Sequence, residues 1–311
     1  MRRVWSAGPG DGGHALSVVQ GGPVPQVRLP EAMRRCAERR PCDRRAGPVE
    51  GDAAVSDPAH IVHLGDCLGP EGLASLPDKS VDHVITDPPY EAEAHTLGRR
   101  RGKAGGGAEE SPLDFPAITQ EQRQAVAVAL ARVARRWVVV FCQAEAVAAW
   151  KAALEAGGGS YRRPMVWVKP GAAPQFTGDR PGMGYESMVA AHAPGRSRWN
   201  GGGKHGVYIY PPCGDGLHMT QKPLELMLSL VRDFTDPGEL ICDPFAGSGT
   251  TGVACKCLGR RFIGWERDPK YHAIAERRIR DAREQYVLPL AKGPKPEQGE
   301  LLASARAAEG E

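Results

Sequence analysis

Residues 243–251, Asp-Pro-Phe-Ala-Gly-Ser-Gly-Thr-Thr, have a composition and a setting suited to binding a nucleoside-containing ligand. An apolar run, residues 240–242, leads into them, and a segment with helical spacing follows. Gly247 and Gly249 let the backbone approach a ligand closely, and the first turn of the following helix offers unpaired N–H groups. Glu266 ends a later apolar run, where an acid can accept hydrogen bonds from ribose hydroxyls. The pattern predicts a site for an adenosine-containing cofactor.

Two common nucleotide classes fit this segment poorly. The full dinucleotide fingerprint is absent because position 252 supplies the only further glycine, and no Gly-Lys-Ser or Gly-Lys-Thr follows. NAD and ATP are therefore disfavoured. A tight structural turn would also explain the two glycines alone, but it would not explain why an acid, Glu266, follows them at the spacing typical of a ribose-binding site.

A second candidate site is Asp87-Pro88-Pro89-Tyr90, which directly follows the apolar run of residues 81–86. The two prolines stiffen the turn and remove N–H donors, so that carbonyl oxygens face outward. The Asp87 carboxylate and the Pro88 carbonyl could together accept both hydrogens of an aromatic amino group, and the Tyr90 ring could lie flat against the base. Taken by itself, the tetrapeptide would also fit a rigid turn at the end of a strand.

Together the two segments resemble the motifs of DNA methyltransferases that methylate amino groups. Three further stretches match that family, namely Leu64-Gly65-Asp66-Cys67, His218-Met219-Thr220-Gln221-Lys222-Pro223 and Gly264-Trp265-Glu266-Arg267-Asp268. The resemblance covers residues 60–286, with Met219 in place of the more usual proline. The catalytic motif precedes the cofactor motif, which is similar to the circularly permuted β group of the family. RNA and protein methylases with a related motif usually run in the other order.

The resemblance implies S-adenosylmethionine as the cofactor. The residues that it assigns to the cofactor site are Asp66, Cys67, Thr220, Gln221, Lys222, Asp243, Phe245, Gly247, Ser248, Gly249, Thr250 and Glu266. Within this set the glycine-rich loop would line the methionine end, and residues 220–222 would close the pocket near the carboxylate. Glu266 would hold the ribose, and Asp66 would contact the adenine edge with the help of the Cys67 backbone.

The resemblance also assigns the target base to Asp87, Pro88, Pro89 and Tyr90. A base inside a duplex is out of reach, so it must be flipped out of the stack. The site would then align its amino nitrogen with the sulfonium methyl for a direct displacement, without a covalent intermediate. Aspartate at position 87 favours N6 of adenine, because enzymes that act on N4 of cytosine more often carry serine there. Cytosine N4 remains the nearest alternative.

Other functions are weaker alternatives. An RNA or protein methylase and a catalytically idle DNA-binding protein both remain, although the intact Asp87 and Gly247/Gly249 argue against an idle protein. Pro212-Cys213 resembles the nucleophile dipeptide of cytosine-C5 methylases. It lies in a segment rich in glycine and proline, and the amino-methylating motif is complete elsewhere, so we interpret Cys213 as incidental.

The elements that must position these motifs alternate between apolar runs and helical segments. The predicted strands are residues 61–64, 81–86, 137–142, 164–169, 185–192, 240–242 and 261–265. The predicted helices are residues 68–76, 119–135, 144–156, 223–234, 250–258 and 268–286. This alternation predicts an α/β fold with a mostly parallel, doubly wound sheet. The family resemblance implies that this sheet is a Rossmann-like class I methyltransferase fold with an inserted DNA-recognition region.

The chain divides into a methyltransferase domain, residues 57–286, between a disordered extension, residues 1–56, and a loose tail, residues 287–311. Residues 91–112 are expected to form a mobile loop, and residues 171–217 a target-recognition region for double-stranded DNA. The basic residues expected to meet DNA phosphates are Arg180, Arg196, Arg198, Lys204 and His205.

Composition narrows the setting of the protein. None of the eight cysteines forms a Cys-x-x-Cys pair, so a metal site has little support and free thiols in a reducing compartment are expected. No run of 18 apolar residues suits a membrane span, and the N-terminus does not resemble a secretory signal. We expect a cytoplasmic protein associated with the nucleoid. The sequence favours neither a monomer nor a homodimer.

Overall fold

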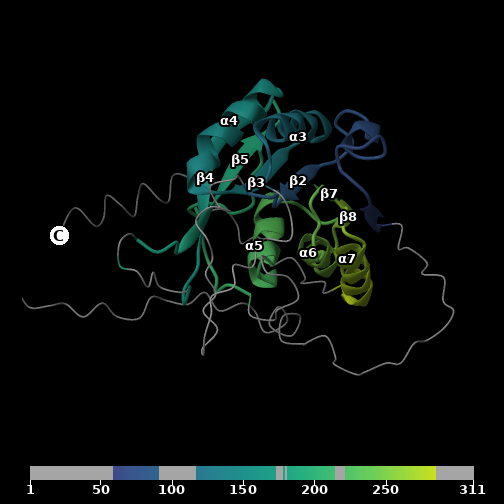
Figure 1. Cartoon of the computed structure of the whole chain (residues 1–311). Coiled ribbons are helices and arrows are strands. Elements are labelled where there is room, and N and C mark those ends of the chain that lie inside the picture. Colours follow the sequence, from purple (N-terminus) through teal and green to yellow (C-terminus); the bar gives the residue numbers. More distant parts are fainter. Residues whose placement is uncertain (1–58, 91–116, 173–177, 179–180, 214–220, 285–311) are drawn as a thin grey trace, which may run out of the picture.

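The computed structural model describes residues 59–90, 117–172, 178, 181–213 and 221–284, and its centre is one β-sheet (Figure 1). The strand order is β1-β8-β7-β2-β3-β5-β4-β6. The strands are β1 (His60–Leu64), β2 (His83–Thr86), β3 (Trp137–Cys142), β4 (Ser160–Val168), β5 (Tyr185–His192), β6 (Val207–Ile209), β7 (Leu240–Asp243) and β8 (Arg261–Glu266).

Strand directions confirm the prediction of a mostly parallel sheet. β1, β8, β7, β2 and β3 run parallel to one another, whereas β5 lies antiparallel between β3 and β4. β6 pairs parallel with β4 at one edge. Because the parallel strands all point the same way, the segments that follow β1, β8, β7 and β2 meet at one edge of the sheet. We call this edge the carboxyl edge.

Two layers of helices cover the sheet. α3 (Gln120–Val133) and α4 (Val147–Ala156) lie on one face, and α5 (Leu224–Phe234), α6 (Thr250–Cys257) and α7 (Pro269–Asp281) lie on the other (Figure 1). The position of β3 between these two layers explains why its sequence is an unbroken apolar run. Val139 and Phe141 belong to the core beneath α5, whereas Val138 and Val140 belong to the core beneath α3 and α4. A strand covered on both faces needs apolar side chains at every position.

Local signals place several element boundaries correctly. Thr119 caps α3 in a complete capping box with Gln122, as the sequence predicts. Asp268 caps α7 by accepting a hydrogen bond from the Lys270 N–H, with proline in the first turn. α7 ends at Asp281 rather than near residue 286, and the predicted helix 144–156 begins with a short 3₁₀ turn before α4.

Two predictions about secondary structure are wrong. Residues 68–76 do not form a helix, and only a 3₁₀ turn forms over Leu73–Ser75. The chain folds back tightly here, because a Cβ at Gly72 would lie only 2.1 Å from the Cys67 carbonyl oxygen. The second error concerns the strand β6, which is not among the predicted strands and lies within the expected recognition region 171–217. A three-residue strand gives too short a pattern to be read from sequence.

Several predicted segments lie outside the described residues. These are the extension 1–56, the loop 91–112, the tail 287–311, and parts of the recognition region 171–217. The proposed division into domains therefore stays a prediction. In the part of the chain that the structure describes, no helix is both long and apolar enough to cross a membrane.

Candidate active site

Four acidic residues follow or end four neighbouring strands at the carboxyl edge. In the order β1-β8-β7-β2, these residues are Asp66, Glu266, Asp243 and Asp87. They are scattered over two hundred residues of sequence, yet the parallel strands bring them to one side of the sheet. This edge therefore collects the residues that the sequence assigned to the cofactor and to the target base.

The glycine-rich loop between β7 and α6 supplies a close backbone approach. Gly247 and Gly249 have left-handed backbones, with φ of +53° and +79°. A Cβ at Gly249 would lie 2.8 Å from the Ala275 Cβ, so this glycine lets α7 pack against the loop. A Cβ at Gly247 would meet no heavy atom within 4 Å. The space beside Gly247 can therefore admit a ligand.

Side chains hold this loop in place from two directions. Arg278 of α7 donates hydrogen bonds to the Ser248 carbonyl oxygen at 2.6 Å and to the Thr250 Oγ1 at 3.2 Å. The Ser248 Oγ donates to the Gln221 Oε1 at 3.2 Å. The structure thus brings Gln221 to the loop, whereas Thr220 lies outside the described residues. Ser248 and Thr250 contribute to the shape of the loop through these bonds.

Glu266 and Asp66 lie side by side where β8 and β1 end. The Glu266 carboxylate accepts hydrogen bonds from the Gly247 N–H at 2.8 Å and from the Asp268 N–H at 2.9 Å. The Gly65 N–H donates to the Glu266 carbonyl oxygen at 2.9 Å, which places Asp66 next to this acid. Each carboxylate oxygen of Glu266 has a second lone pair, so the group can still accept ribose hydroxyls.

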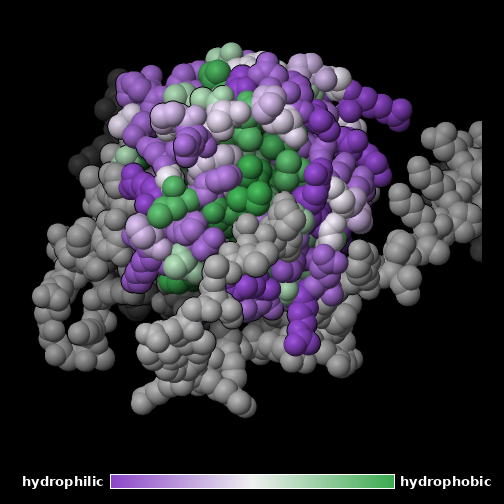
Figure 2. All heavy atoms as spheres, turned by 90° about the vertical axis from the view of Figure 1, so that its right-hand side faces the viewer, coloured by the Kyte–Doolittle hydropathy of each residue, from purple (hydrophilic) through white to green (hydrophobic). Residues whose placement is uncertain are grey.

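Apolar surface flanks Asp66. Leu64 and Leu68 on either side of it are exposed, whereas Cys67 is buried. Burial raises the pKa of the Cys67 thiol to about 12, so this thiol is not a reactive thiolate at neutral pH. Figure 2 shows a hydrophobic area rimmed by hydrophilic residues on the face that lies to the right in Figure 1. An acid beside apolar side chains suits a flat, amino-bearing ring such as adenine.

Replacing Glu266 with alanine is expected to weaken the binding of S-adenosylmethionine by about 1–3 kcal/mol, through the loss of charged hydrogen bonds. The same change frees the Gly247 N–H, so the loop loses one of its anchors. Isothermal titration calorimetry measures the dissociation constant directly. Glu276→Ala, which removes an exposed acid from α7, is the matched control. An unchanged dissociation constant for Glu266→Ala would contradict the ribose role.

Asp87 belongs to a buried cluster of charged groups that the sequence did not predict. Lys222 forms a close ion pair with the Asp87 Oδ2 and lies 3.2 Å from the Glu186 Oε2. The Tyr90 hydroxyl donates to the same Glu186 oxygen at 2.6 Å, and Lys169 pairs closely with the other oxygen. Only 6% of the Lys222 side chain is exposed. We call these five residues the charged cluster.

One oxygen of Asp87 differs from the rest of the charged cluster. Its Oδ1 is buried and has no hydrogen-bond partner among the residues that the structure describes. An unpaired buried acceptor is unfavourable unless a ligand satisfies it. Pro88 is buried behind Asp87, whereas Pro89 and Tyr90 are partly exposed. The arrangement leaves one acceptor and one aromatic ring available for a base that carries an amino group.

The charges within the cluster stabilise one another. Burial raises the pKa of Asp87, and Lys222 opposes this effect. Burial also works against the charge of Lys222, but the carboxylates of Asp87 and Glu186 outweigh it and raise the pKa of Lys222. Glu186 is buried too, yet the two lysines hold its pKa at about 2. At neutral pH Lys222 is therefore a cation and Glu186 an anion.

Asp243 connects the two motifs. Its carboxylate accepts hydrogen bonds from the Thr86 hydroxyl at 2.7 Å and the Thr251 hydroxyl at 2.6 Å, and from the Phe245 N–H at 3.1 Å. Burial raises its pKa to about 6. Thr86 immediately precedes Asp87, so these bonds fix the distance between the end of β2 and the glycine-rich loop. Phe245 is partly buried beside it.

Sequence reasoning missed Glu186, Lys169 and the role of Thr86. A signal for Glu186 was present, because it is the single acidic residue of the strand β5. The sequence placed Lys222 near the carboxylate of the cofactor, a role that stays a prediction, and in the structure Lys222 pairs with Asp87 and Glu186. Within the described residues, no group of three or more His, Cys, Asp or Glu side chains could hold a metal ion.

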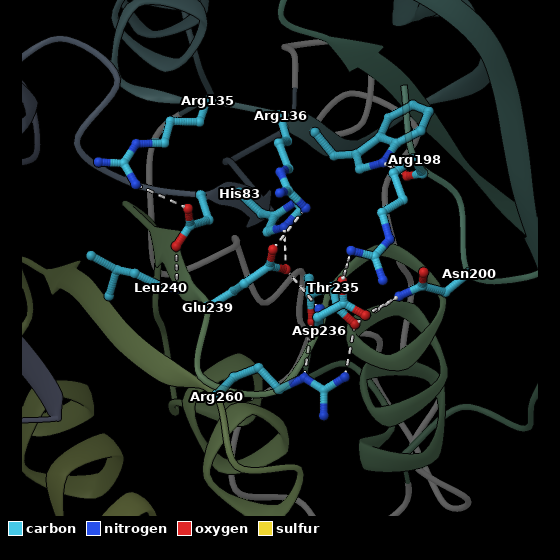
Figure 3. A network of polar contacts seen from close by, with 12 residues as sticks. His83, Arg135, Arg136, Arg198, Asn200, Thr235, Asp236, Glu239, Leu240 and Arg260 are labelled. Atoms are coloured by element: carbon cyan, nitrogen blue, oxygen red, sulfur yellow. Dashed lines mark hydrogen bonds and ion pairs between the residues drawn. The ribbon is translucent and has the colours of Figure 1, made fainter. Parts of the chain in front are cut away.

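The predicted DNA-binding residues that the structure describes do not converge on this site. The Trp137 Nε1 at the start of β3 donates to the Arg198 carbonyl oxygen, and the Arg198 guanidinium pairs with Asp236 at 2.8 Å (Figure 3). Lys204 pairs with the buried Asp233 at 3.0 Å. Because β3 starts at the edge opposite the carboxyl edge, both basic residues lie away from Asp87.

Among the described residues of that set, Arg196 and His205 give no further contact with the site. Arg196 and His205 are exposed neighbours of the same segment, and Arg180 lies outside the described residues. Asn200 anchors the segment by donating to the Thr235 carbonyl oxygen at 3.0 Å and to Asp236 at 3.1 Å (Figure 3). The contacts of Arg198, Asn200 and Lys204 thus attach this part of the recognition region to the end of α5.

Comparison with known proteins gives one consistent group. A family model described as DNA methylase, of the N6/N4 type, matches residues 192–277. The chain is 31% identical over 216 residues to YubD of Escherichia coli K12, whose name describes it as a methylase, and the match covers 69% of this chain and 88% of that protein. It is 24% identical over 285 residues to the type II methyltransferase M.HinfI of Haemophilus influenzae, covering 80% and 73% of the two chains.

Solved structures share the fold. The crystal structure of the M1.HpyAVI–SAM complex has a TM-score of 0.53 and 26% identity, and the match covers 70% of this chain and 98% of that one. The cytosine-N4-specific PvuII DNA methyltransferase has a TM-score of 0.53 and 17% identity, with coverage of 81% and 93%. The second likeness concerns the fold alone. Together they confirm the predicted methyltransferase fold.

Proposed function

The chain belongs to the N6/N4 family of DNA methylases, and from this membership we propose that it methylates N6 of adenine in double-stranded DNA. It is a DNA methyltransferase that uses S-adenosylmethionine. The observation that supports an exocyclic amino group as the target is the state of Asp87, and the preference for adenine rests on the aspartate at this position. One of its oxygens is held by Lys222, and the other is buried and has no partner among the residues that the structure describes, which suits the acceptance of a hydrogen bond from an amino group.

The residues at the cofactor site fit S-adenosylmethionine. The open space beside Gly247 and the acids Glu266 and Asp66 at neighbouring strand ends match a ligand with a ribose and an adenine. When bound, the cofactor supplies an electrophilic methyl group. Gln221, which contacts the glycine-rich loop through Ser248, would help to close the site on the methionine side.

The residues around Asp87 would bind and orient the base. The unpaired Asp87 Oδ1 would accept one amino hydrogen, and the Pro88 carbonyl oxygen would accept the other. This leaves the lone pair of the amino nitrogen aimed away from both acceptors. The Tyr90 ring, whose hydroxyl is held by Glu186, would lie against the base. Alignment of the nitrogen rather than acid–base chemistry supplies most of the acceleration.

DNA would approach the carboxyl edge, where the base must enter. Tyr185 and Met183 are exposed and precede Glu186, so they lie at the same edge and are candidates for contact with a flipped base or its neighbours. A DNA substrate also supports a cytoplasmic, nucleoid-associated enzyme. The roles of Arg180, Arg196, Arg198, Lys204 and His205 in phosphate binding remain predictions.

DNA incubated with the protein and S-adenosylmethionine is expected to contain N6-methyladenine and no N4-methylcytosine. Both bases present an amino group conjugated to a ring nitrogen, so the choice depends on pocket size and on the aspartate at position 87. Genomic DNA from a strain without DNA methylases is the substrate, because it contains every short sequence. The product is digested to nucleosides and separated by mass spectrometry.

The outcomes of this experiment separate the alternatives. N4-methylcytosine in place of N6-methyladenine would contradict the argument from Asp87 and leave the reaction type intact. Methylation of RNA in preference to DNA in a competition assay would contradict the proposed substrate. Asp87→Ala protein, incubated in parallel, shows that the product comes from this enzyme.

A further inference from the structure

Glu186 is the member of the charged cluster that connects the two groups around the target base. Its Oε2 accepts the Tyr90 hydroxyl at 2.6 Å and lies 3.2 Å from the Lys222 ammonium, and that ammonium holds Asp87. Glu186 itself is held by Lys169, which follows the end of β4. Its side chain is 11% exposed. Glu186 is the second residue of β5 and belongs neither to the glycine-rich loop nor to the segment Asp87–Tyr90.

We propose that Glu186 is a positioning residue for methyl transfer, fixing the Tyr90 ring and the Asp87 carboxylate in one arrangement. The proposal rests on the proposed function, since it concerns the same reaction. Glu186 does not contact the base in this scheme. It acts through the Tyr90 hydroxyl on one side and through Lys222 on the other.

The geometry leaves Tyr90 and Lys222 dependent on this carboxylate. A tyrosine ring can rotate about its side-chain bonds, and a hydrogen bond from its hydroxyl to a buried anion restricts that rotation. The Lys222 ammonium lies 5.5 Å from the centre of the Tyr90 ring and 5.0 Å from that of Phe141, within cation–π distance of both. Without Glu186, the ammonium keeps one carboxylate partner and the Tyr90 hydroxyl loses its acceptor.

A purely structural role explains the charged cluster poorly. Burying two acids and two lysines is expensive, and apolar side chains of similar volume usually stabilise a fold as well or better. The charged groups lie at the ends of β2, β4 and β5 and beside α5, next to the unpaired Asp87 oxygen. The cluster therefore suits the orientation of Asp87 and Tyr90 better than it suits the stability of the sheet.

Glu186→Gln tests the proposal with little change in shape. We expect kcat for methyl transfer to genomic DNA to fall about 10- to 100-fold, because misplacement of a reacting group by about 1 Å has effects of this size. The dissociation constant for S-adenosylmethionine should stay within about twofold, because the hydrogen bonds and ion pairs that the structure gives Glu186 are with Tyr90, Lys169 and Lys222. Glu155→Gln on the exposed face of α4 is the matched control.

A double-mutant cycle distinguishes positioning from general damage. Tyr90→Phe removes only the hydroxyl, so Glu186→Gln should have a smaller effect on kcat in the Tyr90→Phe background than in the wild type. The same cycle is measured in the free energy of unfolding by urea, which reports the bond between the two residues without any need for activity. Strict additivity in both measurements would overturn the proposal.

The pH profile supplies a second readout that a structural role would not move. Asp87 faces Lys222, Lys169, Glu186, Tyr90 and Asp243, and the negative charge of Glu186 raises the pKa of Asp87. Removing that charge should lower this pKa, so the acidic limb of the kcat profile should move to lower pH in Glu186→Gln. No movement of the acidic limb, with an unchanged kcat, would contradict the proposal.

Failure of this proposal differs from failure of the proposed function. If the wild-type protein methylates DNA and Glu186→Gln does so equally well, only the positioning role is wrong. If the wild type methylates no DNA, the proposed function is wrong. In that case the unfolding cycle still decides whether Glu186 holds Tyr90, and an absent coupling overturns the role.

Discussion

Replacing Asp87 with alanine is expected to lower the rate of methyl transfer by about 100- to 1000-fold, the range seen when one preorganised polar group is removed from an active site. The change deletes the unpaired oxygen that would accept the amino group, and it leaves Lys222 with Glu186 as its remaining carboxylate partner. Affinity for S-adenosylmethionine should change little, because Asp66, Glu266 and the glycine-rich loop, which would bind most of the cofactor, lie at the ends of β1, β8 and β7. Single-turnover transfer of a labelled methyl group measures the rate, and calorimetry measures the affinity.

The isosteric variant Asp87→Asn separates shape from charge. It keeps the volume of the side chain but can turn an NH₂ group toward the target amino group, so its rate should also be low. Glu145→Ala, an exposed acid beside α4, is the control for handling and purity. Loss of cofactor binding in folded Asp87→Ala protein would show that Asp87 belongs to the cofactor site instead.

Replacing Lys222 with methionine is expected to lower the free energy of unfolding at pH 8 by about 3–5 kcal/mol, as for other buried ion pairs that lose one partner. Methionine fills most of the volume of the lysine stem, so the effect comes from charge. Asp87 and Glu186 would face each other with Lys169 as the remaining lysine of the cluster. Urea unfolding measures the loss, and Lys270→Met on the exposed surface of α7 is the matched control.

The same variant has a defined pH dependence. Lys222 lowers the pKa of both Asp87 and Glu186, so its removal raises both values in the folded state. An acid whose pKa is raised by folding destabilises the fold above that pKa, and the penalty disappears as pH falls through it. The difference in stability from wild type should therefore be smaller at pH 5 than at pH 8. An equal difference at both values would contradict the charge argument.

Features that depend on neighbouring residues could be predicted from the sequence. The capping box at Thr119 and the apolar run of β3 each depend on a few consecutive side chains. The left-handed backbones at Gly247 and Gly249 are also local, since only glycine adopts them without strain. These signals predicted most of the strands and the glycine-rich loop, and the resemblance of the motifs predicted the methyltransferase fold.

Contacts between distant segments could not be predicted in the same way. Glu186 lies in β5 and Lys222 lies just before α5, and the packing of β5 beside β3 brings the acid to the side of the sheet where Lys222 pairs with it. The hydrogen bond from Thr86 to Asp243 likewise requires β2 and β7 to be neighbours in the sheet, although the two strands are far apart in the sequence. The spacing of residues within one segment does not indicate which distant segment will pack beside it.

The basic residues Arg198 and Lys204 give the clearest example of a position that could not be predicted from the sequence. Arg198 and Lys204 lie in a segment whose composition predicted contact with DNA, and composition says nothing about which edge of the sheet the segment reaches. β5 runs antiparallel to β3, so the chain that leaves it emerges opposite Asp87 and pairs there with Asp233 and Asp236. The motifs and the alternation of strands and helices could be predicted from the sequence, because they depend on local backbone and side-chain preferences. Which charges face the target base depends on the order and direction of the strands, and these arise only when distant segments pack together.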